Sequence, residues 1–166
     1  MKYTIIMFIL FVSASIAQDN YFEMVRADFK ADKVKYITEA MNLSEAESPK
    51  FWPVYREYDL ERSKIGDGMY MLIKDYAKSY GNIDNKKADE IMNKLFDLKQ
   101  KNLDLKKEYF KKISKALSPV TAAKFIQIEN EIDNFINVQV NAQLPLIGEN
   151  ADKTEPEIKK VGKEIK

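Results

Sequence analysis

The sequence predicts an all-α protein, and three observations support this fold class. Apolar residues recur at steps of three and four along most of the chain, which is the spacing of one face of an α-helix. No segment alternates apolar and polar residues over the length of a strand. Only five glycines and five prolines occur in 166 residues, so few positions interrupt a helix. We expect a four-helix hairpin or bundle with long antiparallel helices.

The first 17 residues have the pattern of a cleaved signal peptide. A short basic start precedes the unbroken apolar run 5–12, and Ser15 and Ala17 supply the small residues that signal peptidase requires. We therefore place the cut between Ala17 and Gln18. The run is shorter than the roughly 20 residues of a membrane-spanning helix. We expect a periplasmic protein with no stable membrane insertion after cleavage.

The exported chain is expected to form a single helical domain, 18–148. A domain of this length buries enough apolar surface to fold without disulfides. The last stretch, 149–166, has isolated apolar residues among many charges. That composition is typical of disorder, so we expect a disordered charged tail.

The chain contains no cysteine and no histidine, which excludes thiolate and imidazole chemistry. It also lacks the GxxxxGK[ST], GxGxxG and GxSxG motifs, so we expect no enzyme activity, no cofactor and no metal site. Met69 and Met71 favour core filling over binding of a soft metal, because residues two apart on a helix face different directions. With 27 basic against 26 acidic residues, a nucleic-acid partner is not expected.

The first helix of the exported chain is predicted over 22–41 and ends at a break at 42–44. Helical steps place five residues on one apolar stripe of this helix. The stripe comprises Phe22, Val25, Phe29, Tyr36 and Ala40.

The second helix has two alternative starts and runs to about Ser79. Ser44 begins it if Ser44 and Glu47 form a capping box. Alternatively, Ser48 is the N-cap and a proline follows at the first helical position. Pro53 predicts a kink near the first turns, and the two glycines of 66–68 a second bend. The apolar positions are Phe51, Tyr55, Tyr58, Ile65, Met69, Leu72 and Tyr76.

A turn at 81–84 precedes the third helix, predicted over 85–117 with Asp84 as its N-cap. Its heptad seam suits an antiparallel partner helix. Asn102 occupies one core-type position of this seam, either to fix the register or as a partly hydrated polar residue. The apolar seam residues are Ile91, Leu95, Leu98, Leu105, Tyr109 and Ala116.

Ser118 and Pro119 predict the start of a fourth helix, with serine as the N-cap and proline at the first helical position. We expect this helix to reach about Gln143, before a proline and a glycine end it. Its predicted apolar face comprises Ile126, Ile128, Ile132, Phe135, Ile136 and Val140.

Charge is unevenly distributed between the last two predicted helices. Lysines outnumber acidic residues two to one between Lys86 and Lys115, whereas 119–144 is acidic. A basic rim beside an apolar groove attracts acidic, partly unfolded chains. The alternative is an ordinary helix whose lysines keep it soluble and pair with the acidic helix. The predicted rim comprises Lys94, Lys99, Lys101 and Lys106.

Two similar strings, 43–47 and 117–121, stand at predicted helix starts. They resemble the doubled LTxxQ motif of the Spy/CpxP-like periplasmic family, with serine in place of threonine and without the glutamine. The string 51–55 is similar to one found in relatives described as sensors linked to extracytoplasmic-function sigma factors. The positions that match are Leu43, Ser44, Glu47, Phe51, Trp52, Pro53, Tyr55, Leu117, Ser118 and Thr121.

The resemblance implies a long helical hairpin in a cradle-like antiparallel homodimer. It also implies ATP-independent, chaperone-like binding of unfolded envelope proteins. The alternative is a regulatory module that docks on an envelope-stress sensor or an anti-sigma factor. A homodimer is expected independently, because the chain has too few helices to bury every apolar face. Metal sensing through histidine is not expected in a chain without histidine.

Overall fold

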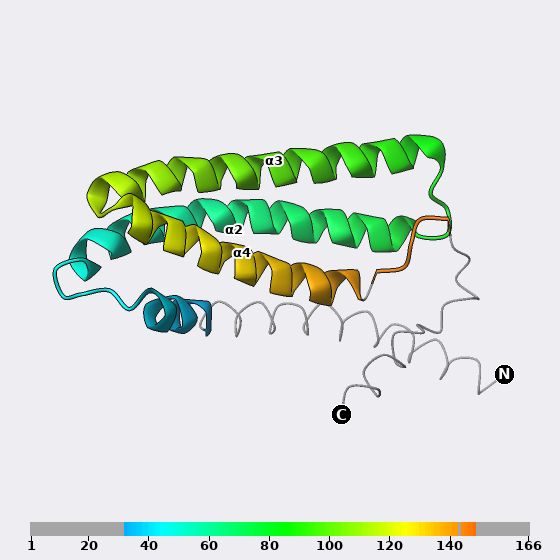
Figure 1. The fold of residues 1–166 in the computed structure, drawn as a ribbon. Helices are drawn as coiled ribbons and strands as arrows, with labels where there is room; N and C mark the ends of the chain where they lie inside the picture. The colour runs from blue at the N-terminus through cyan, green and yellow to red at the C-terminus, as the bar shows by residue number, and fades with distance from the viewer. Residues whose placement is uncertain (1–31, 143, 149–166) are drawn as a thin grey trace, which may run out of the picture. The chain divides into compact units, whose positions relative to one another are not determined.

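The computed structural model describes residues 32–142 and 144–148 (Figure 1). Helices and their connecting turns make up these residues, which include no strand, so the all-α fold class is confirmed. The chain divides into two compact units, Met1–Asn42 and Leu43–Lys166. The signal peptide, its cut and the tail 149–166 lie outside the described residues. The single domain 18–148 and the cradle-like shape stay predictions.

The described part of the first unit is the helical segment 32–41. Asn42 follows it with a φ of 46°, and its N–H donates to the Thr38 carbonyl at 3.3 Å. A residue in the left-handed region commonly ends a helix, which explains the predicted break. The buried residues here are Ile37 and Met41, whereas Tyr36 is exposed.

The predicted stripe of this helix is therefore one position out of register. The fully apolar side chains of Ile37 and Met41 are buried in place of Tyr36 and Ala40, since tyrosine keeps a polar hydroxyl. The stripe positions Phe22, Val25 and Phe29 lie outside the described residues.

Helix α2 spans Ser48–Ser79. A helical turn precedes it, because the N–H of Ser48 donates to the Ser44 carbonyl at 3.0 Å. The Glu47 carboxylate accepts from the Ser44 N–H at 3.0 Å, which is one half of the predicted capping box. Ser48 is not the N-cap; its hydroxyl accepts from the Trp52 indole at 3.2 Å. The N-cap is Glu47, so neither predicted alternative gives the N-cap of this helix. The predicted end at Ser79 is confirmed.

Helix α3 spans Asn85–Ala116, within one residue of the prediction. The turn before it contains Gly81 with a φ of 90°, a conformation that favours glycine. The Asp84 side chain accepts from the Lys87 N–H at 2.7 Å, so the predicted N-cap is confirmed. Ile113 is buried in this helix although the predicted seam omits it.

Helix α4 spans Pro119–Asn141. The Ser118 hydroxyl accepts from the Thr121 N–H at 3.0 Å, which confirms the predicted cap. The predicted apolar face is only partly right. Ile128 and Ile132 are buried, but Phe135 is 60% exposed, while Phe125 is buried and was not predicted. The cause is Asp133, whose inward contacts are described below; a residue two positions later faces away from it.

The three helices of the second unit run antiparallel in sequence order (Figure 1). Among the described helices, the backbone of α3 packs against both α2 and α4, whereas α2 and α4 meet through side chains. At one end, Phe51 of α2 and Phe125 of α4 form an edge-to-face ring pair at 5.6 Å. At the other end, Leu72, Tyr76 and Ile91 form a buried cluster between α2 and α3.

The segment after α4 returns to that second cluster. Leu144 packs against it, and the Tyr76 hydroxyl donates to the Pro145 carbonyl at 2.6 Å. We call residues 144–148 the return segment. It ties the end of α4 to α2 beside the turn that joins α2 and α3 (Figure 1).

The two glycines inside α2 differ in their surroundings. A Cβ on Gly68 would lie 2.7 Å from the Leu98 Cδ2 of α3, so glycine permits the close approach of the two helices. A Cβ on Gly66 would meet only the Arg62 guanidinium, at an ordinary 3.6 Å. Gly66 therefore costs helix stability without any packing benefit.

We predict that Gly66→Ala stabilises the protein by about 1 kcal/mol, the difference between glycine and alanine in a helix interior. Gly68→Ala is the matched control, because its methyl group must displace Leu98 and the resulting overpacking offsets the gain in helix propensity. Urea unfolding followed by circular dichroism measures both. An equal gain for the two variants would contradict the packing role of Gly68.

Candidate functional site

The structure brings the two motif strings together at one end of the second unit. Hydrogen bonds from Ser44 hold the pKa of the Glu47 carboxyl below its ordinary value, and the nearby Thr121 side chain lowers this pKa further. Glu47 belongs to the first string and Thr121 to the second. The Ser118 hydroxyl also lies 2.8 Å from the Thr121 hydroxyl. These polar motif positions therefore order the starts of α2 and α4.

The aromatic motif residues lie directly beneath this junction. Phe51 and Tyr55 are buried and stack with ring centroids 5.8 Å apart, and Trp52 packs edge-on against both. Pro53 is exposed on the outer side of α2, and Leu43 and Leu117 are half-buried. The matched positions therefore form a structural junction, and none of them lines the pocket described below.

A polar cluster lies between the three helices in the middle of the second unit. Asp133 of α4 accepts from Arg62 of α2 at 2.7 Å and from Lys106 of α3 at 2.6 Å. Asn102 donates to the same carboxylate at 3.0 Å. Because Asn102 contacts Asp133 of α4, the structure favours the alternative in which Asn102 fixes the register of the helices over the one in which it is a partly hydrated polar residue.

Electrostatics in this cluster favour the charged forms. Burial raises the pKa of Asp133, but Arg62 and Lys106 outweigh burial, so the pKa of this carboxyl lies below its ordinary value. Burial likewise lowers the pKa of Arg62, and Asp133 more than compensates, so that pKa is raised. Asp133 is thus a partly buried anion held by two cations.

Glu129, one helical turn before Asp133, extends the cluster toward the aromatic end. It is 1% exposed and accepts from the Tyr58 hydroxyl at 2.8 Å. Burial first, and then Glu129, raise the pKa of Tyr58 above its ordinary value. Tyr58 also packs against Tyr109 and Phe125, so one side chain joins the polar and aromatic parts of the interior.

The predicted basic rim is wrong in one member, Lys106, which belongs to the polar cluster. Lys106 is 8% exposed and is hydrogen-bonded to Asp133 and, at 2.7 Å, to the Asn130 side chain. It is therefore an interior partner of α4 and contributes nothing to an open rim. The sequence shows that α3 is basic and α4 is acidic. It does not show that Lys106 pairs with Asp133, because this pairing depends on how the two helices are rotated about their axes.

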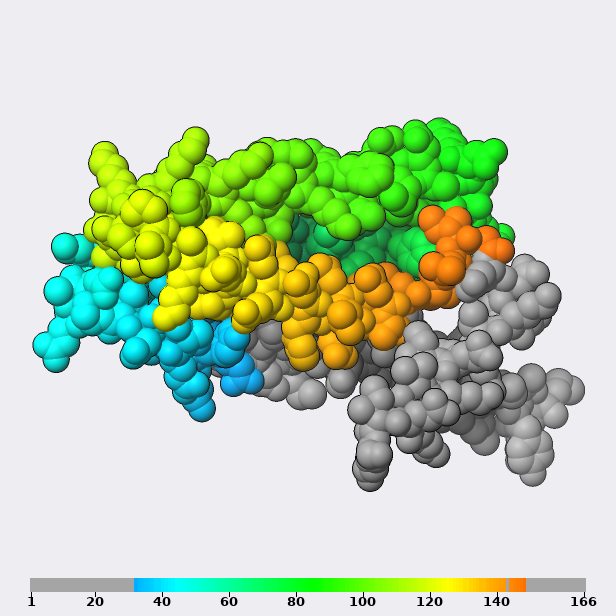
Figure 2. Space-filling view, viewed as in Figure 1, coloured from blue at the N-terminus to red at the C-terminus, as the bar shows by residue number. Residues whose placement is uncertain are grey.

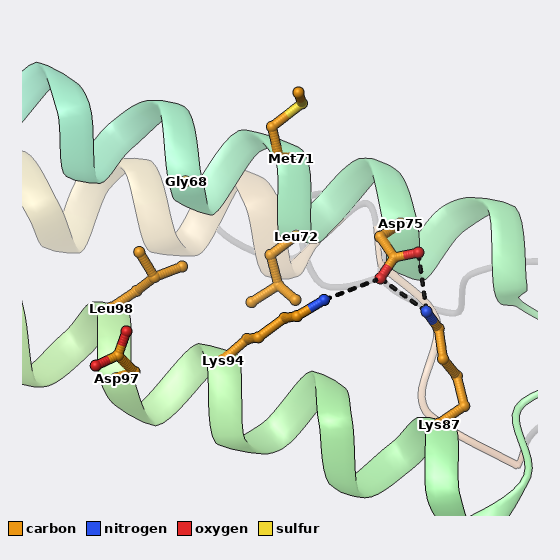
Figure 3. Close-up of a pocket in the computed structure, with 8 residues that line it drawn as sticks. All are labelled: Gly68, Met71, Leu72, Asp75, Lys87, Lys94, Asp97 and Leu98. Carbon is orange, nitrogen blue, oxygen red and sulfur yellow. Dashed lines mark hydrogen bonds and ion pairs between the residues drawn. The ribbon is translucent and has the colours of Figure 1, made fainter.

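The other predicted rim lysines lie on two sides of α3. Lys94 approaches Asp75 of α2 at 4.0 Å, and Figure 3 shows it beside Lys87, which bonds the same carboxylate at 2.8 Å. Lys101 follows Lys94 by seven residues and so lies on the same side of the helix. Lys99, seven residues before Lys106, lies on the side toward α4 and is exposed.

Lys87 and Lys94 border a surface pocket of about 490 Å³. Its charged lining is balanced, with Lys87 and Lys94 against Asp75 and Asp97. Gly68 and Leu98 form part of its apolar lining (Figure 3). Lys87 and Lys94 approach Asp75, and Asp97 pairs with Lys101 outside the lining, so this pocket offers little attraction to a charged ligand.

An exposed apolar row on α3 was missed by the sequence reasoning. Phe96, Leu103 and Phe110 are 59%, 47% and 37% exposed and stand seven residues apart. Lys106 lies between Leu103 and Phe110 in sequence and contacts α4, so this row borders the α3–α4 side. The heptad spacing of this row is present in the sequence, but spacing alone does not show which of two neighbouring apolar seams is buried.

Lysines flank this apolar row. Lys99 lies between Phe96 and Leu103 and Lys107 between Leu103 and Phe110, and both are exposed. Lys107 and Asp104 form a long ion pair of 3.4 Å between exposed side chains one helical turn apart, and solvent screens this pair strongly. The row and its lysines form an apolar surface with positive charge beside it, on the α4 side of α3. Of the four lysines of the predicted rim, only Lys99 belongs to this surface.

No protein-family model matches this chain, and neither the curated proteins nor the solved structures gave a match. The resemblance to Spy/CpxP-like proteins therefore stays a prediction. Across residues 32–142 and 144–148, no helix has the length and apolar character to cross a membrane. The same residues contain no group of three or more carboxylates placed to hold a metal ion.

We predict that Asp133→Asn destabilises the protein by about 3 kcal/mol, because it leaves two partly buried cations without their shared anion. Asp97→Asn is the control, since Asp97 forms an exposed pair with Lys101 that contributes little. Urea unfolding at neutral pH measures both losses. Similar losses for the two variants would contradict the central role of Asp133.

We also predict a pH dependence that Asp133 causes. Its pKa is lower in the folded protein, so its stabilising effect is complete above the unfolded carboxyl pKa of about 4. The effect is lost as the pH falls through the folded-state pKa. The stability difference between the wild type and Asp133→Asn should stay constant from about pH 5 to 7 and shrink below about pH 4. A difference unchanged in acid would contradict this prediction.

Proposed function

We propose that this protein binds partly unfolded polypeptides through the apolar row on α3, as an ATP-independent, chaperone-like protein of the periplasm. The observation behind the proposal is the row itself: three large apolar side chains, regularly spaced and exposed on a helix whose other side is buried. Exposed apolar patches commonly mark interaction sites. Binding by surface contact alone needs no nucleotide and no catalytic group.

The lysines beside the row support a preference for acidic clients. Lys99 and Lys107 give local positive charge next to apolar surface, which speeds the encounter with acidic chains. The predicted signal peptide and the resemblance to Spy/CpxP-like proteins support the same function and place it in the envelope. The proposal depends on neither of them alone.

We predict that the purified protein suppresses aggregation of a denatured client without ATP, and that replacing Phe96 or Leu103 by Ser weakens this suppression. Each of these side chains contributes about 1.5–3 kcal/mol when fully buried by a client. The expected loss is roughly tenfold in client affinity per replacement. Light scattering of the aggregating client measures the protein ratio required.

The matched control is Leu60→Ser, because Leu60 is a similarly exposed apolar residue on α2. It should retain full suppression. Added salt should weaken suppression of acidic clients by screening Lys99 and Lys107. Equal loss in all three serine variants, or no suppression by the wild type across several clients, would contradict the proposed function.

One observation favours a second candidate, a regulatory module that docks on a membrane sensor or an anti-sigma factor. Residues spaced by seven on a straight helix suit pairing with one specific partner helix. This candidate predicts a single envelope partner that the Leu103→Ser variant fails to capture. Capture of many unrelated unfolded proteins would favour the chaperone-like function instead.

The homodimer stays part of the proposal, but the apolar row is poorly suited to form its interface. An antiparallel two-fold contact centred on Leu103 would place Lys99 opposite Lys107 of the partner subunit. Like charges placed opposite each other destabilise such a contact. A dimer through another surface leaves the row open to clients. Multi-angle light scattering measures the oligomeric state.

A further inference from the structure

A row of asparagines lies along α4. Asn130, Asn134, Asn137 and Asn141 follow steps of four, three and four residues, which place them on one face of a helix. All four are exposed. Within the described residues, Asn130 has a partner in Lys106, whereas the other three side chains form no hydrogen bond inside the fold. We call these four residues the amide row.

The four asparagines of the amide row do not stabilise α4. Asparagine lowers helix stability relative to alanine, because its side chain competes for backbone hydrogen bonds. The surrounding sequence is also unusual, since residues 134–148 contain no charge in a chain that is 32% charged. Solubility is normally provided by charged residues, so this surface uses neutral amides where a lysine or a glutamate would serve better.

The amide row borders the apolar row of α3. The Lys106 amine, located between Leu103 and Phe110 in sequence, bonds the Asn130 side-chain oxygen at 2.7 Å. This contact places the beginning of the amide row beside the apolar row. Figure 2 shows the side on which α3 and α4 lie in front of α2, with a hollow where the two helices separate. The helical spacing that continues each row from the Lys106–Asn130 contact places the two rows along the two sides of this hollow, which we call the groove.

We propose that this groove binds its client as an extended chain and recognises the client backbone. An asparagine amide both donates and accepts, so it pairs with the N–H and C=O groups that an extended chain presents. The apolar client side chains then lie on Phe96, Leu103 and Phe110, and acidic client residues face Lys99 and Lys107. Recognition of this kind is independent of client sequence.

The dimensions of the groove suit such a client. The amide row extends about 16 Å at the helical rise of 1.5 Å per residue. An extended chain covers that length with about five residues at 3.3 Å each. A helical client is a poorer match, because its backbone groups are already hydrogen-bonded to each other. This inference rests on the proposed function and adds the binding mode.

The test uses two labelled peptides of about ten residues, in which valine and serine alternate and aspartate stands at each end. The second peptide carries methyl groups on alternate backbone nitrogens, which removes hydrogen-bond donors and leaves the side chains unchanged. Fluorescence anisotropy measures their affinity for the full-length wild type and for the double variant Asn134→Ala/Asn137→Ala. Asn93→Ala is the matched control, since Asn93 is an exposed asparagine of α3 outside both rows.

We expect the wild type and the control to prefer the unmethylated peptide by about tenfold. The double variant should lose this preference and bind both peptides at the weaker level. Its helicity and its resistance to urea should be equal or higher, because alanine is the better helix former. A structural role of the amide row would instead lower stability and binding together.

Three results would overturn the inference. If the double variant keeps the tenfold preference, the side-chain amides of Asn134 and Asn137 do not bind the peptide backbone, while the proposed function stands. If the double variant changes the oligomeric state and not the peptide affinity, the row is a contact between copies of this chain. If the wild type binds neither peptide and also fails to suppress aggregation, the proposed function fails together with the inference.

Discussion

The arrangement of the helices depends on one carboxylate that three helices share. Asp133 of α4 binds Arg62 of α2 and Lys106 of α3, so one carboxylate forms ion pairs with both of the other helices. Because its two cations come from different helices, Asp133 sets the rotation of α4 about its own axis. That rotation turns Phe135 outward, draws Lys106 inward and aligns the amide row with the apolar row of α3.

Local features of this fold were predictable from the sequence, because they depend on neighbours in the chain. Asp84 and Ser118 cap their helices as short-range chemistry requires, and α3 lies within one residue of its predicted range. The rotation of α4 was not predictable in this way. It depends on ion pairs between residues 27 and 71 positions apart, and no periodicity in α4 shows that Asp133 contacts the other two helices while Phe135 is exposed.

The candidate surface was also only partly predictable, because it too depends on contacts between residues far apart in the sequence. A basic rim beside an apolar surface could be predicted as a type of site because lysines concentrate on α3, and its function stays a prediction. Its members were predicted only in part, because Lys94 and Lys101 form ion pairs with Asp75 and Asp97 and Lys106 is buried. Only contacts between helices show which side of α3 remains open. Lys99 and the apolar row lie on that side.

The return segment has an effect on the helix that precedes it. Helix ends normally fray, because the last residues gain conformational freedom and lose few contacts when they unwind. In this protein the chain beyond α4 is held by the Tyr76 hydroxyl and by the packing of Leu144. Unwinding the last turns of α4 therefore gains less conformational entropy than unwinding a helix end whose following residues make no contacts. A helix anchored at both ends tolerates residues that would melt a free one, and this explains how α4 accommodates several poor helix formers close to its C-terminus.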